Sequence, residues 1–396
     1  MGLRSLLLGS KFLFILILAK ICNIRVVGIY GILQATAIIF SFVIGAELHT
    51  EVARRISGSN SFKKILSQHI SWVFLIGVLF APLVIVGLIQ LKVVEQLNYF
   101  IYFLILLGEA LSLEVGRYLL TLFRPIASNI LQFIRGGIWI PAALSGIYFY
   151  DADPVGIILI FWCIGLWIAI IYGLVTLGSE RPTLLLPNFK WLVITGKKSF
   201  YNYLISLVNQ VQSYGDRYVV GYFFGDAILG AYLFYLNIAA SIQIFSQTGS
   251  IGVITPHILI SAREMNFVKF KYYLRKMLND SIVIIMGVSL LLYVVSNYLI
   301  VGYKDIGITQ YQYLLPWMMV LYSFLSVAQI AQIGLYALRM DRKNLLTNIA
   351  LSLVLFGGYF IFLPYLGIIG VLISGLVVSV LSMGYKWRLL RIMTPS

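Results

Sequence analysis

The run VGIILIFWCIGLWIAIIYGLVTL, residues Val155–Leu177, contains no charged side chain over its whole length. A helix of about 20 apolar residues spans the hydrocarbon core of a bilayer, which is roughly 30 Å thick. This run therefore predicts a transmembrane helix. Apolar runs of similar length recur along the rest of the chain, so that about twelve spans are expected in all.

The predicted spans are Leu6–Ile21, Val26–Leu48, Ile70–Ile89, Tyr99–Leu122, Ala127–Phe149, Val155–Leu177, Ser199–Phe224, Ala227–Thr248, Leu278–Ile300, Leu314–Ala337, Leu345–Leu363 and Gly367–Leu389. The chain of 396 residues is 61% hydrophobic and only 11% charged. A soluble domain of this length needs more polar surface than that composition provides. The sequence predicts an all-α polytopic membrane protein.

Lysine and arginine are divided unequally between alternate loops. The N-terminus, the even-numbered loops and the C-terminal tail hold 21 of them, including Arg54 and Arg55, whereas the opposite loops hold four, namely Lys20, Arg25, Lys92 and Lys304. Loops rich in basic residues stay in the cytoplasm. We therefore expect an inner-membrane-type protein with both termini cytoplasmic. Basic loops facing anionic lipids also account for the net charge of +15 without a nucleic-acid partner.

Cys22 and Cys163 lie far apart in the sequence, in or at the edge of spans, and form neither a disulfide framework nor a metal site. Arg4 precedes the first apolar run as in a signal peptide. Lys11 interrupts that run, however, and no cleavage site follows, so we expect an uncleaved first span. No motif for a cofactor or metal is present.

The two halves of the chain resemble each other. Gly28-Ile29-Tyr30 at the start of the second span is echoed by Gly230-Ala231-Tyr232 at the start of the eighth. Val155-Gly156-Ile157-Ile158 at the sixth span is echoed by Leu366-Gly367-Ile368-Ile369 at the twelfth. Six spans in each copy give both copies the same orientation, as in transporters built from parallel repeats. About 12 transmembrane helices in two pseudo-symmetric six-helix bundles are therefore expected.

The predicted domains are an N-terminal lobe, 1–177, a cytoplasmic amphipathic linker, 178–198, and a C-terminal lobe, 199–396. Pro182 and Pro187 interrupt the linker and deny a helix its backbone donors there. After them, Trp191 beside Lys190 predicts a short helix on the membrane surface.

A polar stripe follows the seventh span. At 100° per residue, its members fall on a single arc of about 120°; they are Asn202, Ser206, Asn209, Gln210, Ser213, Asp216 and Arg217. Such a stripe either faces a hydrated cavity or forms hydrogen bonds between helices, each worth about 0.6 kcal/mol. Because the stripe is long, we favour a cavity wall.

Charged residues inside spans are costly and mark functional sites. Glu114 and Arg117 have the i,i+3 spacing of a pair that neutralises itself. Glu109 has no partner on its own helix, so it either takes up a proton or pairs with a base on a neighbour. Arg135 keeps its charge, and its planar fork suits phosphate. Lys11 either extends to the cytoplasmic side or reaches a substrate.

Asp216 and Arg217 are adjacent near the outer end of the seventh span, just before a predicted tight turn at Gly225-Asp226-Ala227. Adjacent helical side chains diverge by about 100°, so these two are not expected to pair with each other. They serve either as an interfacial anchor or as site residues. Enzyme signatures are missing: Glu47-Leu48-His49 is no zincin motif, and no phosphate-binding glycine loop is present.

The stretch YGDRYVVGYFFGDAILGAY, Tyr214–Tyr232, resembles the mid-chain signature of the O-antigen flippases, the polysaccharide-exporter branch of the multidrug/oligosaccharidyl-lipid/polysaccharide (MOP) superfamily. In that family an Asp-Arg or Asp-Lys pair closes the seventh helix. Val27–Gly31, followed by Glu51–Arg55, is similar to the family's N-terminal stretch. At 396 residues the chain is compact for this family.

The resemblance implies export of an oligosaccharide carried on undecaprenyl pyrophosphate, from the cytoplasmic to the periplasmic leaflet. Membrane lipids and other membrane proteins of polysaccharide assembly are implied partners. Residues expected to bind the substrate are Lys11, Arg117, Arg135, Asn202, Asn209, Ser213 and Arg217. Glu47, Glu109 and Asp216 are candidates for coupling to a proton or sodium gradient.

Two alternatives remain open. A multidrug-type exporter of the same superfamily would use acids to bind cationic drugs, whereas arginine is at least as prominent here. A glycan polymerase or ligase usually has an extended outer loop with basic residues, but the longest outer loop, around Val301–Tyr313, contains only Lys304.

Overall fold

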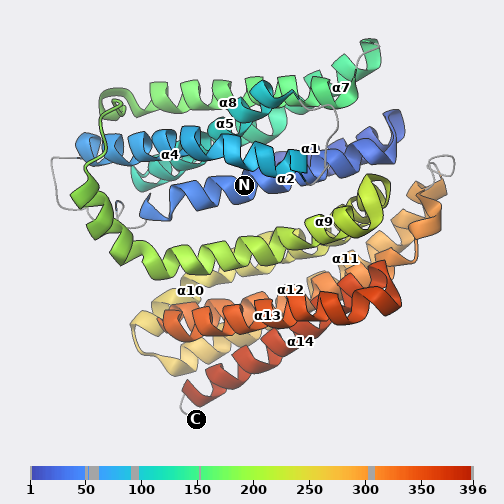
Figure 1. The fold of residues 1–396 in the computed structure, drawn as a ribbon. Helices are drawn as coiled ribbons and strands as arrows, with labels where there is room; N and C mark the ends of the chain where they lie inside the picture. The colour runs from blue at the N-terminus through green and yellow to red at the C-terminus, as the bar shows by residue number, and fades with distance from the viewer. Residues whose placement is uncertain are drawn as a thin grey trace. The chain divides into compact units, whose positions relative to one another are not determined.

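The computed structural model describes residues 2–49, 52, 62–90, 98–150, 153–301 and 308–393. All regular structure in these ranges is helical (Figure 1). The first half consists of α1 (Gly2–Ile21), α2 (Ile24–Gly45), α4 (Phe62–Gln90), α5 (Tyr99–Thr121), α6 (Pro125–Phe133), the π-helix η1 (Ile134–Ile138), α7 (Trp139–Phe149), α8 (Pro154–Leu177) and η2 (Gly178–Glu180). The second half consists of α9 (Phe189–Ser246), the π-helix η3 (Gln247–Ile251), α10 (Gly252–Arg263), α11 (Phe267–Val301), η5 (Thr309–Tyr311), α12 (Leu314–Ala337), α13 (Asp341–Leu366) and α14 (Ile368–Met393).

Among the described residues, ten helical stretches are long and apolar enough to cross a membrane. One of them, Phe189–Arg263, has 75 residues and contains both the seventh and the eighth predicted span. These two spans are separated at Gly225, whose φ of 80° and ψ of 173° are not helical. The 20-residue α1 supplies the first span. The chain is therefore an all-α polytopic membrane protein with about 12 transmembrane helices, as predicted.

Local sequence explains where these helices begin and end. Asp153 caps α8, because its carboxylate accepts hydrogen bonds from the backbone nitrogens of Val155 and Gly156 at 3.2 and 2.8 Å. Pro154 follows at the first helical position, where its missing donor is not needed. At Gly225 the backbone adopts a conformation open almost only to glycine, so this residue fixes the predicted turn between the seventh and eighth spans.

The helix packing of the first half recurs in the second. In the first half α4 packs on α5, α5 on α6 and α8, and α7 on α8. In the second half α11 packs on α12, α12 on α13 and α14, and α13 on α14. These are the third to sixth spans of each predicted repeat, paired in the same way. The two halves thus form pseudo-symmetric bundles.

By their contacts, the residues divide into one unit, Met1–Gly230, and a second unit, Ala231–Ser396. The seventh span therefore has most of its contacts within the first unit. The lobe boundaries expected from the sequence, 1–177 and 199–396, are drawn from the repeat and stay a prediction.

The linker, residues 178–198, is hydrogen-bonded to α4. The hydroxyl of Ser67 accepts a hydrogen bond from the backbone nitrogen of Thr183 at 3.0 Å, and that of Ser71 from Leu185 at 2.8 Å. The helix expected around Trp191 is not a separate element, because α9 begins at Phe189 and runs on into the seventh span. Figure 1 shows the first part of α9 at an angle to the rest.

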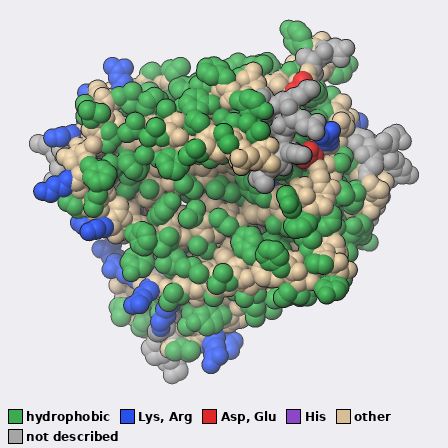
Figure 2. All heavy atoms as spheres, in the orientation of Figure 1, with side chains coloured by type: hydrophobic (Ala, Val, Ile, Leu, Met, Phe, Trp, Pro, Cys, Tyr) green, Lys and Arg blue, Asp and Glu red, His purple; other side chains and the backbone are tan. Residues whose placement is uncertain are grey.

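Apolar side chains cover most of the face seen in Figure 2. On α4, for example, Leu79 and Leu83 are exposed, as is expected for a helix facing lipid. Arg54, Arg55, Lys92 and Lys304 of the charge count lie outside the described residues, as do Glu51 and Ala53 of the N-terminal stretch that resembles flippases.

Candidate functional site

The fifth span contains a π-helical turn at the position of a predicted site residue. α6, η1 and α7 form one continuous helix, and Arg135 and Gly136 lie in η1. π-Helical turns are rare and are frequent at functional sites. A Cβ atom on Gly136 would lie 3.0 Å from Cε of Lys11. The absence of a side chain at Gly136 thus lets the Lys11 side chain of α1 lie directly against the π-helical turn.

Arg135 is paired with Glu109 of α5. Its Nε donates to Glu109 Oε2 at 2.8 Å, and its Nη2 donates to the same oxygen. The other oxygen of Glu109 accepts from the indole Nε1 of Trp162 at 3.0 Å. Of the two roles left open for Glu109, the structure therefore shows pairing with a base on a neighbouring helix.

Lys11 interacts electrostatically with Glu109 and Arg135, but within the described residues its ammonium group makes no hydrogen bond. We call Lys11, Glu109 and Arg135 the cationic cluster. It contains two bases and one acid. The Nη1 atom of Arg135 also makes no hydrogen bond to a described residue. Two donor groups of the cationic cluster, the ammonium of Lys11 and Nη1 of Arg135, therefore have no hydrogen-bond acceptor among the described residues.

Four aromatic rings from four helices pack beside the cationic cluster. The ring of Phe14 on α1 lies 5.1 Å from that of Tyr30 on α2 and 5.3 Å from that of Trp139 on α7. Trp139 stacks on Trp162 of α8 at 6.3 Å with an interplanar angle of 20°. We call these four residues the aromatic cluster. It anchors the cationic cluster, because Trp162 donates to Glu109 and Trp139 Nε1 donates to the backbone oxygen of Arg135 at 3.2 Å.

Arg117 is the centre of a second ionic network. Its Nη1 donates to Glu114 Oε1 at 2.7 Å, which confirms the i,i+3 pair, and its Nη2 donates to Glu47 Oε1 at 3.2 Å. Nδ1 of His49 lies 3.2 Å from Nη1, and the guanidinium stacks over the ring of Phe42 at 5.1 Å. After Gly45, α2 turns through two left-handed residues, the second of which is Glu47.

The same network continues to α4 through His69. Its Nδ1 lies 4.0 Å from Glu114 Oε2 and contacts the hydroxyl of Tyr118, while its Nε2 lies 3.4 Å from the carbonyl oxygen of Gly45. His69 and Glu114 are both fully buried. Arg117 is thus surrounded by acceptors from α5 and from the residues that follow α2, with His69 of α4 behind them.

The polar stripe of the seventh span is partly exposed. Ser213 is exposed, and Asn202 and Asn209 are half-buried. Ser206 lies near the carboxylate of Glu47, which connects the stripe to the Arg117 network. Asn202 and Ser213 make no hydrogen bond to Lys11 or Arg135.

Arg217 makes no hydrogen bond or ion pair with the charged residues of either ionic group. Its Nη1 donates to the carbonyl oxygen of Gly31 on α2 at 3.3 Å, and its guanidinium lies 4.6 Å from the ring centre of Tyr214. Its Nε is buried and has no hydrogen-bond partner among the described residues. The carboxylate of Asp216 accepts from the backbone nitrogen of Arg217 at 2.9 Å rather than from its guanidinium.

The structure therefore brings Lys11, Glu109 and Arg135 together, places Glu47 with Arg117 in a second network, and leaves Asp216 and Arg217 at a third position. Sequence reasoning missed Phe14, Tyr30 and Trp162 of the aromatic cluster and the two histidines. His49 follows Glu47 by two residues and could have been expected near Arg117; nothing in the sequence pointed to Trp162. No group of three or more metal-binding side chains is found in the described ranges.

No family profile and no curated protein matches the sequence. Solved structures do match over nearly the whole chain. A multidrug-resistance MATE-family transporter of the MOP superfamily in an inward-facing conformation has a TM-score of 0.74 at 13% identity, and covers 97% of this chain and 94% of its own. The MATE multidrug transporter DinF-BH, solved in complex with a ligand, has a TM-score of 0.67 at 14% identity, covering 99% and 95%.

A MOP-superfamily transporter from Pyrococcus furiosus, described as having a binding pocket of reverse polarity, has a TM-score of 0.66 at 12% identity and covers 100% of this chain and 94% of its own. At such low identity these matches define the fold alone. The chain is a multi-pass membrane protein with the fold of MOP-superfamily transporters.

Proposed function

We propose that this protein exports an oligosaccharide linked to undecaprenyl pyrophosphate, from the cytoplasmic to the periplasmic leaflet of a bacterial inner membrane, with both termini in the cytoplasm. Transport would proceed by alternating access, without catalysis or a cofactor. The fold supports alternating access, because solved transporters with this fold include one in an inward-facing and one in an outward-facing conformation.

The observation that carries the proposal is the excess of positive charge in the cationic cluster. Glu109 balances Arg135, so a protonated Lys11 beside this pair would leave one positive charge for a ligand. The uncommitted ammonium of Lys11 and Nη1 of Arg135 can both donate to an anion. Phosphate oxygens suit this pair, because an arginine fork and a lysine ammonium both form charge-assisted hydrogen bonds with them. The half-buried amides of Asn202 and Asn209 remain candidates for contacts with sugar hydroxyls.

A multidrug-type exporter is the second candidate, and the MATE multidrug structures favour it. The aromatic cluster could stack on a planar drug, and a cationic drug would pair with Glu109 rather than with the bases. The description of the Pyrococcus furiosus protein indicates that pocket polarity varies among proteins of this fold. The sign of charge in the pocket therefore distinguishes the two candidates.

The test uses export of lipid-linked oligosaccharide in a deletion strain that contains no other flippase. Arg135→Ala should reduce export about tenfold, as the loss of one charge-assisted hydrogen bond of roughly 1.5 kcal/mol requires. Arg135→Lys should reduce it less, because the charge is kept. Lys11→Ala should reduce export to a similar extent as Arg135→Ala. Normal glycan display in the deletion strain, with a change only in drug susceptibility, would favour the multidrug exporter.

Glu47, Glu109 and Asp216 remain the proposed coupling residues. Asp216→Asn tests one of them directly, in vesicles with imposed proton or sodium gradients. If Asp216 couples transport, export by the variant should lose its dependence on one gradient. Unchanged export over the whole range of gradients would make Asp216 an anchor.

A further inference from the structure

We infer that His69 of α4 and Glu114 of α5 together bind one exchangeable proton, and that this proton is the ion coupled to transport. The inference rests on the proposed function and deepens it, because it chooses the proton over sodium and adds two residues to the proposed coupling groups. All of the residues that carry it belong to the first unit.

Glu114 has one carboxylate oxygen without a donor. Its Oε1 accepts a hydrogen bond from Arg117 at 2.7 Å, whereas its Oε2 is buried and has no hydrogen-bond partner among the described residues. The whole side chain is fully buried, so this oxygen has lost its hydration without gaining a donor in return. One added proton at this position would supply the missing hydrogen bond.

His69 is the titratable group beside that oxygen. Its Nδ1 lies 4.0 Å from Glu114 Oε2, and its Nε2 lies 3.4 Å from the carbonyl oxygen of Gly45. A carbonyl oxygen only accepts, so Nε2 carries the hydrogen of the neutral ring. Nδ1 then accepts from the hydroxyl of Tyr118. In its neutral form His69 therefore offers no donor to Glu114.

A proton taken up from solvent changes this arrangement without breaking a covalent bond. On Nδ1 it gives His69 a second N–H donor, which reaches hydrogen-bonding distance of Glu114 Oε2 after an approach of about 1 Å. On Oε2 it turns the carboxylate into a carboxyl group that donates towards Nδ1. The same two atoms are joined in both cases, so the proton belongs to the pair rather than to either residue.

Arg117 neutralises Glu114 only in part. Its guanidinium donates to Glu114 at 2.7 Å and to Glu47 at 3.2 Å, so one positive charge is divided between two carboxylates. Acidic groups buried in a membrane-spanning bundle are costly and recur in proton relays. A proton on the pair would complete the charge balance of Glu114.

The other ionisable groups near the pair come from few elements. They are Glu47 and His49, which follow α2, Tyr118 of α5 and, at longer range, Arg135 of η1, which is paired with Glu109. Lys63 and Lys64 of α4 are exposed, and Arg25 lies at the opposite end of α2. The helices α6 and α8, which also pack on α5, contain no acidic, basic or histidine residue.

The pair lies against a strained turn that leads to the polar stripe. After Gly45, Ala46 and Glu47 have φ angles of 45° and 52°, which residues other than glycine rarely adopt. His69 Nε2 contacts the carbonyl oxygen at the start of this turn, and Glu47 at its end lies near Ser206 of the seventh span. A shift of His69 on proton binding therefore acts on the turn, and through it on the seventh span. Such a connection lets one proton bias a two-state element.

Infrared difference spectra of the full-length protein in nanodiscs, recorded between alkaline and acidic buffer, detect the proton directly. Isotope-labelled histidine separates imidazolium bands from the C=O band of a protonated carboxyl group. Glu114→Gln has the shape of the protonated side chain and keeps an acceptor for Arg117, so it should fold normally and lose the protonation signal of the pair. His69→Gln should lose it as well. Glu264→Gln, at an exposed position after α10, is the matched control and should keep it. An unchanged signal in Glu114→Gln would overturn the proton site.

Coupling is measured by export of lipid-linked oligosaccharide in proteoliposomes with an imposed proton or sodium gradient. A proton gradient should raise export by the unchanged protein about tenfold, within the range of typical coupling energies, and a sodium gradient should not. Glu114→Gln should lose this response, whereas Glu264→Gln should keep it. A response to sodium alone, or a full response of Glu114→Gln to the proton gradient, contradicts the inference.

The inference and the proposed function fail in different ways. If the pair takes up no proton while export still depends on Arg135, only the inference is wrong. Normal glycan display in the deletion strain would refute the proposed function instead, and the spectra of the purified protein would still decide whether the pair binds a proton.

Discussion

Arg117 shows how a single cation is held inside a membrane-spanning bundle. Its guanidinium contacts the carboxylates of Glu47 and Glu114, and Glu114 is fully buried. A buried ion pair contributes little net stability, but removal of one partner leaves an uncompensated charge. Residues of this network therefore matter for folding whether or not they touch the substrate.

Arg117→Ala should lower the free energy of unfolding by about 3–5 kcal/mol, because two carboxylates lose their cation. Thermal unfolding in detergent, or at graded denaturant, measures this change. Lys276→Ala on the exposed side of α11 is the control and should have an effect below about 0.5 kcal/mol. An Arg117→Ala protein as stable as the control would mean that the network holds no buried charge.

At the scale of elements, α2 and the start of the eighth span cross at two glycines. A Cβ on Gly28 would collide with the backbone oxygen of Asp226, and one on Gly230 with that of Ile24. These glycines are the equivalent positions of the sequence repeat. Arg25 pairs with Asp226 beside them at 3.5 Å. The crossing thus depends on direct contact between backbones.

Gly28→Ala and Gly230→Ala should each destabilise the protein by about 1–3 kcal/mol, because an added methyl group must displace a backbone rather than a flexible side chain. The measurement is the same thermal unfolding in detergent. Gly384→Ala, where the added carbon meets nothing within 4 Å, should be neutral. If all three variants were equally stable, the close crossing would not exist in the folded protein.

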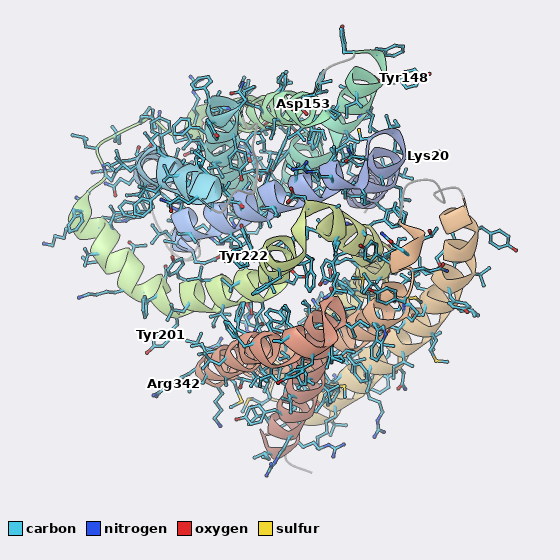
Figure 3. The ribbon with its side chains drawn as sticks, turned by 45° about the vertical axis from the view of Figure 1, so that its right-hand side comes forward. Lys20, Tyr148, Asp153, Tyr201, Tyr222 and Arg342 are labelled. Carbon is cyan, nitrogen blue, oxygen red and sulfur yellow. The ribbon has the colours of Figure 1, made fainter. Side chains whose placement is uncertain are left out.

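At the scale of the whole molecule, the charge distribution predicts which ends of the helices face the cytoplasm. In the first unit, Figure 3 shows Lys20 and Tyr148 at one end of the helices and Tyr201 toward the other. The first end belongs to the loops that are poor in lysine and arginine. In the second unit, Arg342 lies at the start of α13, next to a loop rich in basic residues.

Tyr148→Cys should react in intact cells with a maleimide that does not cross the inner membrane, because this side chain is 73% exposed on the predicted periplasmic side. Arg342→Cys should react only after the membrane is opened. Both are made with Cys22 and Cys163 replaced by serine. Labelling in the opposite order would reverse the predicted orientation.

The sequence alone determined the spans and the set of charged residues inside them. Transfer into a bilayer depends on the local composition of about 20 residues, so Leu314–Ala337 was predicted with the same bounds as α12. Local chemistry likewise fixed the turn at Gly225 and the pair formed by Glu114 and Arg117.

Only the tertiary structure decided which side chains meet. Glu109 pairs with Arg135 from another helix and binds Trp162 from a third, and His69 joins the Arg117 network from α4. Such contacts depend on the rotation and tilt of each helix against its neighbours, and hydrophobic periodicity is nearly absent from helices that are apolar on all sides. The sequence therefore shows which span contains a charged residue, but packing between the helices determines the partner of that residue.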